Sequence, residues 1–488
     1  MTLMPGSAHE TLRVRAASGR QLGALVLAIS LGLACGGGHA GRTGGPRPEK
    51  PSLADLPEGE THYVSDPESG ARFRLLRAGF ERGGTPLVLV HGLGDAGMGD
   101  FRPVLASLRR TRPVLAFDLP GFGGSSTGRP PYSPERFSEL LSRVIDRYAG
   151  GHADVMGHSM GGAVALMHAG RFAHQVRRLI LLDVAGVLHE EALVGTHLKL
   201  AGQPGAAESG QTPPAVRRLM EVAEGTADTV LRGLRAVTPG TGSIAALAER
   251  GDAPVGARAA LALATTDFGP AIDTVRAPTL IVWGRRDTIA PVRTAWLLRD
   301  RIADAHLVFL EEVGHVPMTE APERLLALVE AHLGGETLEP SIGMPALAST
   351  EGAGQDLRCS GEADRVLRGR FGTITLDGCA RASLLDVQAR HLILRDSSVR
   401  IVSSHLEGLT TTESRVEMTG GSLAAPDERA AIEASGSLLD LAGVVIGAAR
   451  PIEVRSHSRL LLSVCVLRDS QHTRHLHGVR DLQPGATL

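Results

Sequence analysis

Residues 153–170 place three glycines around a single serine, directly after an apolar run and directly before a helix-forming segment. The stretch reads ADVMGHSMGGAVALMHAG, with Ser159 at the turn between its two halves. Small residues at Gly157 and Gly161 permit a sharp, strained turn from strand to helix, where larger side chains would collide. Such a turn lifts the serine hydroxyl clear of the backbone, so that a base can take its proton while a carbonyl carbon approaches. The pattern therefore favours nucleophilic chemistry at Ser159.

Short apolar runs alternate with helical segments over the same part of the chain. Six runs are mostly continuous in their apolar residues: 85–92, 112–121, 152–159, 177–186, 277–287 and 305–315. Such continuous apolar runs are typical of fully buried parallel strands, and their alternation with helices predicts a parallel sheet covered on both faces. The alternation breaks from about 188 to 270, where short helical pieces are joined by Gly/Pro-rich segments. This range is expected to be an insertion that forms a cap over the sheet.

Several motifs, met in chain order, resemble those of the α/β-hydrolase family of serine hydrolases, and of its capped esterases and lipases in particular. They are His91-Gly92-Leu93-Gly94 after the expected third strand, DLPGFGGSS at 118–126, the serine turn itself, WGRRDTIAP with Asp287, and EVGHVPMTEAPE with His315. The order serine, aspartate, histidine along the chain is the order that this fold uses. The resemblance covers residues 62–336 and implies the α/β-hydrolase fold, a mostly parallel sheet with helices on both faces and a helical cap at about 188–270.

The resemblance also implies a role for each site residue. Ser159 would attack an acyl carbon, His315 would take and return the proton, and Asp287 would hold the imidazole and stabilise the imidazolium. Backbone N–H groups of Leu93 and Met160 would hold the oxyanion. The implied activity is that of a carboxylic ester hydrolase which acts through an acyl-enzyme on a small-molecule ester.

Two points stay open within this resemblance. Asp183, at the end of the run 177–186, is the alternative acid, because some members carry the acid after the sixth strand; the setting of Asp287 before Pro291 and a helix favours Asp287. Thioesterases and carbon–carbon bond hydrolases use the same three groups, so the scissile bond is not determined. Epoxide hydrolases and haloalkane dehalogenases of this fold need a carboxylate at the turn, and Ser159 excludes their chemistry.

No cofactor, metal or nucleic-acid partner is expected. No GK[ST] follows the glycines around Ser159, and GLGDAG at 92–97 lacks the dinucleotide-binding pattern. The formal net charge of −2 gives no basic surface for nucleic acid. His472, His475 and His477 have no carboxylate or cysteine nearby in the sequence, so we expect a solvated terminal loop there and no metal site.

Residues 1–35 are expected to be a lipoprotein-type signal peptide. Basic residues precede an apolar run at 21–34 that is too short to span a bilayer comfortably. Leu33-Ala34-Cys35 resembles the end of a bacterial lipobox, in which cleavage leaves the cysteine for lipid attachment. Cys35 would then anchor the protein in a membrane of the bacterial cell envelope, with residues 36–61 as a flexible linker. An ordinary signal peptide, cut near Ala34 or Ala40, would instead make the protein periplasmic or secreted.

Residues 337–356 are expected to be a linker, and residues 357–488 an all-β, right-handed parallel β-helix-like domain. Units of a serine, a spacer and apolar residues at period two recur as SSVRI (397–401), SRVEM (414–418), SLLDL (437–441) and SRLLL (458–462). An irregular β-sandwich or a partly disordered tail is the alternative. Cys359 and Cys379 could close a short loop in an oxidising compartment, which would leave Cys465 buried and free.

A second function is consistent with these features. The chain could be a surface binding or scaffolding lipoprotein, in which the β-helical tail recognises a glycan or a protein and the hydrolase domain is idle. No member of the expected triad lies in the tail. For the enzyme hypothesis we therefore expect the tail to fold independently and to be dispensable for hydrolysis of small soluble esters.

Overall fold

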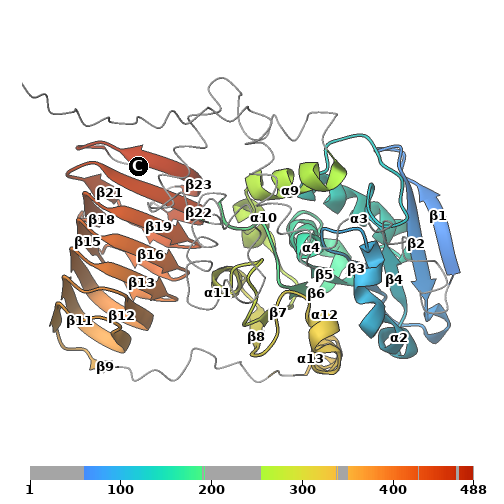
Figure 1. Cartoon of the computed structure of the whole chain (residues 1–488), viewed down its shortest axis with the longest axis horizontal. Coiled ribbons are helices and arrows are strands. Elements are labelled where there is room, and N and C mark those ends of the chain that lie inside the picture. Colours follow the sequence, from blue (N-terminus) through green and yellow to red (C-terminus); the bar gives the residue numbers. More distant parts are fainter. Residues whose placement is uncertain are drawn as a thin grey trace, which may run out of the picture.

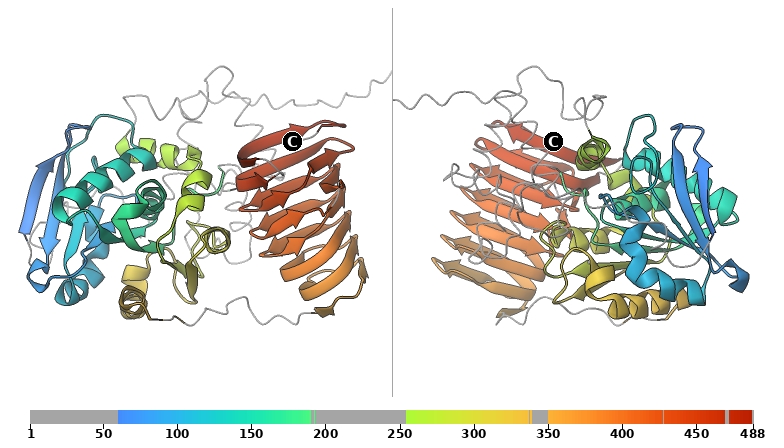
Figure 2. Two further views of the ribbon diagram at one scale, coloured as in Figure 1. Left: turned by 180° about the vertical axis from the view of Figure 1, so that it is seen from behind. Right: turned by 45° about the vertical axis from the view of Figure 1, so that its right-hand side comes forward.

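The computed structural model describes residues 60–189, 192, 254–336, 338, 350–426, 428–468 and 472–486. Two units lie side by side in Figures 1 and 2, an α/β unit up to residue 336 and a β region from residue 350. The expected signal peptide with Cys35, most of its linker and most of the expected cap lie outside the described residues. Among the helices that are described, none is both long and apolar enough to cross a membrane.

The α/β unit is built on one eight-stranded sheet with the order β1-β2-β4-β3-β5-β6-β7-β8. Its strands are β1 Glu60–Ser65, β2 Arg72–Ala78, β3 Leu87–Val90, β4 Val114–Phe117, β5 Ala153–His158, β6 Val176–Leu182, β7 Thr279–Gly284 and β8 Ala305–Leu310. β2 pairs antiparallel with β1 and with β4, and every other pairing is parallel. Each of the six apolar runs coincides with one strand from β3 to β8. The predicted parallel sheet is therefore confirmed, and β1 begins inside the range expected to be a linker.

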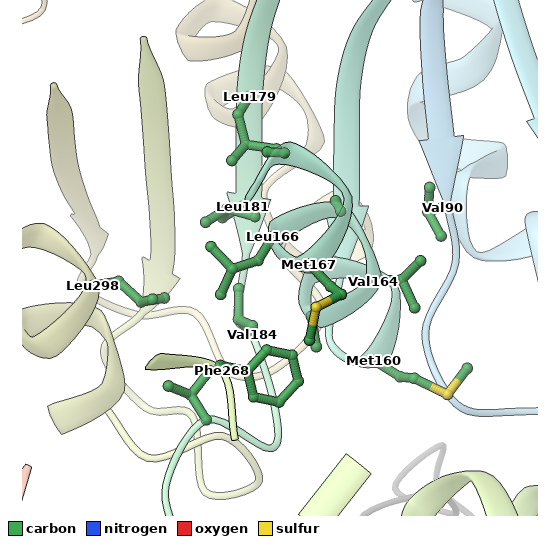
Figure 3. Close-up of a cluster of buried hydrophobic side chains, with 14 of the residues drawn as sticks. Val90, Met160, Val164, Leu166, Met167, Leu179, Leu181, Val184, Phe268 and Leu298 are labelled. Atoms are coloured by element: carbon green, nitrogen blue, oxygen red, sulfur yellow. The ribbon is translucent and has the colours of Figure 1, made fainter. Parts of the chain in front are cut away.

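Helices cover both faces of this sheet. They are α2 Arg102–Thr111, α3 Pro134–Tyr148, α4 Met160–Arg171, α9 Val255–Thr265, α10 Gly269–Thr274, α11 Arg293–Arg301, α12 Pro317–Glu320 and α13 Pro322–Gly334, with short 3₁₀ turns that include η3 Gly97–Phe101. One core cluster joins the sheet to α3, α4, α10 and α11, and a second joins its other face to α2, α12 and α13. Figure 3 shows Leu166 of α4 beside Leu181 of β6, and Val164 of the same helix on the side of Val90 of β3.

The C-terminal part is a fifteen-stranded β region whose pairing closes on itself. Its strands are β9 Thr350–Ala353, β10 Leu357–Ser360, β11 Val366–Asp377, β12 Ala382–Arg395, β13 Ser398–Val402, β14 His405–Leu406, β15 Leu409–Thr412, β16 Arg415–Thr419, β17 Ser422–Ala424, β18 Ala430–Ser435, β19 Leu438–Ala442, β20 Val445–Gly447, β21 Arg450–Val454, β22 Ser458–Arg468 and β23 Thr473–Leu482. Every pairing is parallel except that of β22 with β23. Successive strands stack as β13-β16-β19-β22, as β14-β17-β20 and as β12-β15-β18-β21 around one apolar core.

The recurring serines of the sequence form a buried ladder along this region. Ser397, Ser414, Ser437 and Ser458 lie in consecutive layers, which are 17, 23 and 21 residues apart in the chain. The backbone N–H of each serine donates to the hydroxyl of the serine in the next layer, as from Ser414 to Ser437 at 3.1 Å. Each hydroxyl in turn donates to the carbonyl two residues before it, as from Ser437 to Ser435 at 2.9 Å. Buried polar groups need such partners, which explains why serine recurs at this position.

The expectation of a solvated loop around the C-terminal histidines is wrong. His475 and His477 lie in β23, which returns antiparallel along β22 and covers the edge that the last layer would otherwise expose. His475 Nδ1 lies 3.9 Å from Asp273 Oδ2, and His477 Nδ1 lies 3.7 Å from Asp267 Oδ1. Their carboxylate neighbours therefore come from the α/β unit, about 200 residues away in the sequence. Within the described chain, no group of three or more possible metal ligands includes these histidines.

Candidate active site

Ser159 occupies a strained turn between β5 and α4. Its φ is +53°, in the left-handed region that few residues other than glycine adopt. A Cβ atom on Gly157 would lie 2.2 Å from the Gly161 carbonyl oxygen, and one on Gly161 would lie 2.1 Å from the Val90 carbonyl oxygen. Both positions therefore require glycine, as the sequence predicted. The Ser159 N–H donates to the Leu182 carbonyl oxygen at 2.9 Å, which ties the turn to the end of β6.

Ser159, His315 and Asp287 form one hydrogen-bonded chain. The distance from Ser159 Oγ to His315 Nε2 is 3.0 Å, and that from His315 Nδ1 to Asp287 Oδ2 is 2.8 Å. The three residues follow β5, β8 and β7, so they meet at the carboxyl edge of the sheet. Because Nδ1–H donates to the carboxylate, Nε2 faces the hydroxyl as an acceptor. This arrangement can remove a proton from Ser159.

Backbone groups fix the carboxylate of Asp287. Its second oxygen, Oδ1, accepts the N–H groups of Ile289 at 2.7 Å and Ala290 at 3.0 Å. The Asp287 side chain is fully buried and that of His315 is 10% exposed, so solvent weakens their hydrogen bond little. The orientation of the carboxylate therefore depends on the short loop between β7 and α11.

Glu320 and His158 hold the His315 loop through contacts that the sequence motifs do not indicate. The carboxylate of Glu320 accepts the N–H groups of Gly314 at 2.7 Å and Val316 at 3.0 Å, on either side of His315. His158 Nε2–H donates to the His315 carbonyl oxygen at 2.7 Å. Burial lowers the pKa of His158 to about 3, so its ring is neutral and serves as a hydrogen-bond donor at Nε2. Both residues lie inside the recognised motifs, but nothing in their spacing indicated these contacts.

Asp183, the alternative acid, lies beside the hydrogen-bonded chain of Ser159, His315 and Asp287 but does not take the place of Asp287. Its Oδ1 accepts the N–H of Gly284 at 2.8 Å. Side-chain atoms of Asp183, Asp287 and His315 lie within 4.8 Å of one another, the only group of potential metal ligands in the described chain. Burial, and then the negative charge of Asp287, raise the pKa of Asp183 well above its usual range. The structure therefore brings Asp287 into contact with His315, and Asp183 lies beside this pair with a raised pKa.

The expected oxyanion loop runs directly against the nucleophile. A Cβ atom on Gly92 would lie 3.3 Å from Ser159 Cβ, so the residue before Leu93 touches the serine. Met160 is the first residue of α4, where backbone N–H groups have no partner within the helix. Met160 therefore follows Ser159 directly in the chain, and Leu93 follows a glycine that packs against the serine.

His91 and Asp118 hold the two loops that flank the site. His91 Nε2 accepts the Leu119 N–H at 2.9 Å, while its Nδ1–H donates to the Gly92 carbonyl oxygen at 2.7 Å. The fully buried Asp118 accepts the N–H of Met98 at 2.7 Å and Arg74 Nε at 2.7 Å. A buried carboxylate paired in this way orders its surroundings, so the DLPGFGGSS motif has a structural function here.

Comparisons with known proteins agree with this geometry. The model of the Alpha/beta hydrolase family matches residues 87–328. A 2-hydroxy-6-oxo-2,4-heptadienoate hydrolase of Pseudomonas putida is 32% identical over 266 residues, which cover 52% of this chain and 90% of the relative. A pimeloyl-[acyl-carrier protein] methyl ester esterase of Aromatoleum aromaticum is 32% identical over 258 residues, 50% of this chain and 96% of the relative. The solved structure of a hydrolase from Pseudomonas aeruginosa is 24% identical, with a TM-score of 0.42, and covers 57% of this chain and 99% of that one.

Proposed function

The chain belongs to the alpha/beta hydrolase family, and we propose that it is a serine hydrolase that cleaves carboxylic esters through an acyl-enzyme. One observation carries the proposal: the hydrogen-bonded chain from Ser159 through His315 to Asp287, which begins at a strained turn. Strain of this kind is retained where it serves function, because the rest of the fold must offset it.

The proposed reaction uses each group at a stated atom. His315 Nε2 takes the proton of Ser159 Oγ as that oxygen attacks the carbonyl carbon of the ester. Backbone N–H groups of Leu93 and Met160 stabilise the oxyanion of the tetrahedral intermediate. The imidazolium then gives its proton to the leaving alcohol, and an acyl-enzyme remains on Ser159. A water molecule, activated by His315, releases the acid by the same route in reverse order.

Ester cleavage is preferred over cleavage of a carbon–carbon bond. The named relatives include an esterase and a hydrolase of an oxo-dienoate, so both kinds of substrate occur among similar proteins. A thioester or a carbon–carbon bond would be cleaved by the same three residues. An ester is a less demanding substrate than a carbon–carbon bond, because its alkoxide leaving group needs only the proton that His315 already holds.

The idle-hydrolase alternative is disfavoured by the same geometry. A copy without activity gains nothing from a strained serine, an oriented imidazole and a carboxylate fixed by two N–H groups.

We further propose that the β region is a parallel β-helix. We also propose that lipid on Cys35 anchors the enzyme in the bacterial cell envelope. Fractionation of cells that express Cys35→Ser tests the anchor, because this variant should leave the membrane fraction.

The test of the enzyme proposal compares the wild-type chain with Ser159→Ala. The wild type should hydrolyse short p-nitrophenyl esters, and the variant should lose about four orders of magnitude or more in kcat. Ser142→Ala, which removes a buried serine hydroxyl on α3, is the matched control and should keep full activity. A fluorophosphonate probe should label Ser159 in the wild type. Full activity of Ser159→Ala, or no labelling of a folded wild type, would refute the proposal.

A further inference from the structure

The first residue of α11 reaches across to the β region. Arg293 Nη1 lies 2.7 Å from Asp440 Oδ2, and Nη2 lies 3.2 Å from Asp440 Oδ1, so the two side chains form a bidentate pair. Arg293 Nε donates to Thr419 Oγ1 at 3.1 Å, and Nη2 lies 3.4 Å from the Met418 carbonyl oxygen. The Arg293 side chain is 3% exposed and that of Asp440 is 14% exposed. A guanidinium buried so completely depends on these partners for its solvation.

Arg293 lies only six positions after Asp287, and hydrogen bonds hold the backbone between them. Asp287 Oδ1 accepts the N–H groups of Ile289 and Ala290. The Ala290 carbonyl oxygen accepts Trp283 Nε1–H at 3.2 Å, and the Pro291 carbonyl oxygen accepts the Thr294 N–H at 2.8 Å. A displacement at the start of α11 would therefore pass directly to the loop that orients the carboxylate.

The rest of α11 also lies on the β region. A Cβ atom on Gly443 would lie 2.7 Å from Leu297 Cγ, so the backbone of the β region touches this helix. Arg299 Nη2 donates to Ser403 Oγ at 2.8 Å, and Arg301 donates to the Val464 carbonyl oxygen. Val402, Ala442 and Val464 of the β region belong to the same apolar cluster as the helices of the α/β unit. Figures 1 and 2 show α11 on the side of the α/β unit that faces the β strands.

We propose that Arg293 is a positioning residue, through which Asp440 of the C-terminal β region holds the Asp287 loop in its catalytic geometry. The β region then supports the triad and is not a dispensable appendage, contrary to the expectation from the sequence. The inference rests on the proposed function, since it concerns the same triad. It extends that function, because it assigns part of the active-site support to residues about 150 positions further along the chain.

The test uses the full chain and three single substitutions, two at Asp440 and one at a control carboxylate. Asp440→Asn keeps the shape but removes the charge, and Asp440→Glu keeps the charge. Glu453→Gln removes a carboxylate of β21, on a different stack of strands, and is the matched control. Because a misplacement of about 1 Å can lower a rate about 100-fold, we expect Asp440→Asn to lower kcat about 10- to 100-fold with KM unchanged. Asp440→Glu should recover most of this loss, and Glu453→Gln should behave as the wild type.

Two further readouts separate positioning from loss of fold and from failure of the proposed function. The rate at which fluorophosphonate labels Ser159 should fall with kcat, and the downfield proton signal of the His315–Asp287 hydrogen bond should weaken or vanish in Asp440→Asn. That signal does not depend on any ester being a substrate. If Asp440→Asn does not fold, Arg293→Lys, which keeps the charge but loses the bidentate contact, takes its place. Folded variants with kcat, labelling rate and proton signal within twofold of the wild type would overturn the inference.

Discussion

The buried carboxyl group of Asp183 leads to a prediction about both stability and catalysis. Its pKa is raised well above the usual range, first by burial and then by the charge of Asp287. In the unfolded chain an aspartate has a pKa of about 3.9. Between these two pKa values the native state holds one proton more than the unfolded state, so the free energy of unfolding falls as the pH rises. Above the native pKa both states have lost the proton and the dependence ends.

The size of this effect follows from one proton. Each pH unit in the window costs the wild type about 1.4 kcal/mol of unfolding free energy. Asp183→Asn removes the titration but keeps an oxygen to accept the Gly284 N–H, which lies 2.8 Å from Asp183 Oδ1. The variant should therefore become more stable relative to the wild type by about 1.4 kcal/mol for each pH unit between the two pKa values. Its kcat should stay within about threefold of the wild type, whereas Asp287→Asn should lose about four orders of magnitude.

The assay is denaturant unfolding at a series of pH values, followed by tryptophan fluorescence. The chain has two tryptophans, Trp283 and Trp296, and both lie in the α/β unit, so the signal reports this unit. Glu311→Gln, which removes a carboxylate with 64% side-chain exposure, is the control and should leave the pH dependence unchanged. The reasoning is refuted if Asp183→Asn follows the pH dependence of the wild type. It is equally refuted if this variant loses as much activity as Asp287→Asn.

Two further predictions concern the β region. Ser437→Ala should leave the buried Ser414 N–H without its acceptor and lower the free energy of unfolding by about 1–3 kcal/mol, as measured by circular dichroism in urea. Substitution of the exposed Ser398 by alanine is the control and should have no effect. Equal stability of the two variants would contradict the role of the serine ladder. Cys359 and Cys379 have free thiols whose sulfur atoms lie 3.0 Å apart, so we expect them to form a disulfide in protein exported to an oxidising compartment. Mass spectrometry after alkylation should then find Cys465 as the free thiol that remains in the β region. Alkylation of all three cysteines would contradict the disulfide.

The part of the fold that could be predicted from the sequence is the part with local signals. β3 to β8 are covered on both faces, so each of them appears as a continuous apolar run. β1 and β2 were not predicted, because β1 is the edge strand of the sheet and its neighbour β2 carries Arg72, Arg74 and Arg77. One of these, Arg74, is buried against Asp118 at 2.7 Å. Its partner lies 44 residues away, and no pattern within β2 indicates it.

The same distinction between local sequence signals and long-range contacts applies to the candidate site. Ser159, Asp287 and His315 lie in short motifs that the residue letters alone locate, and close backbone contacts require the glycines at 157, 161 and 284. The contacts of Glu320 and His158 with the His315 loop were missed, because a side chain that binds a backbone group leaves no periodic trace. Sequence thus identifies the groups that react, and less well those that orient them.

The expected linker at residues 337–356 shows the physical limit of such reasoning most clearly. A change in composition marks where the local pattern of the chain changes, but packing continues across it. Arg293 and Asp440 are separated by 147 residues, and each taken alone reads as an ordinary surface charge. Only the stacking of β13, β16, β19 and β22 brings Asp440, and outward apolar residues such as Val402 and Ala442, onto one face. Because the α/β unit buries α11 against that face, the unit of function extends beyond the unit that the sequence pattern delimits.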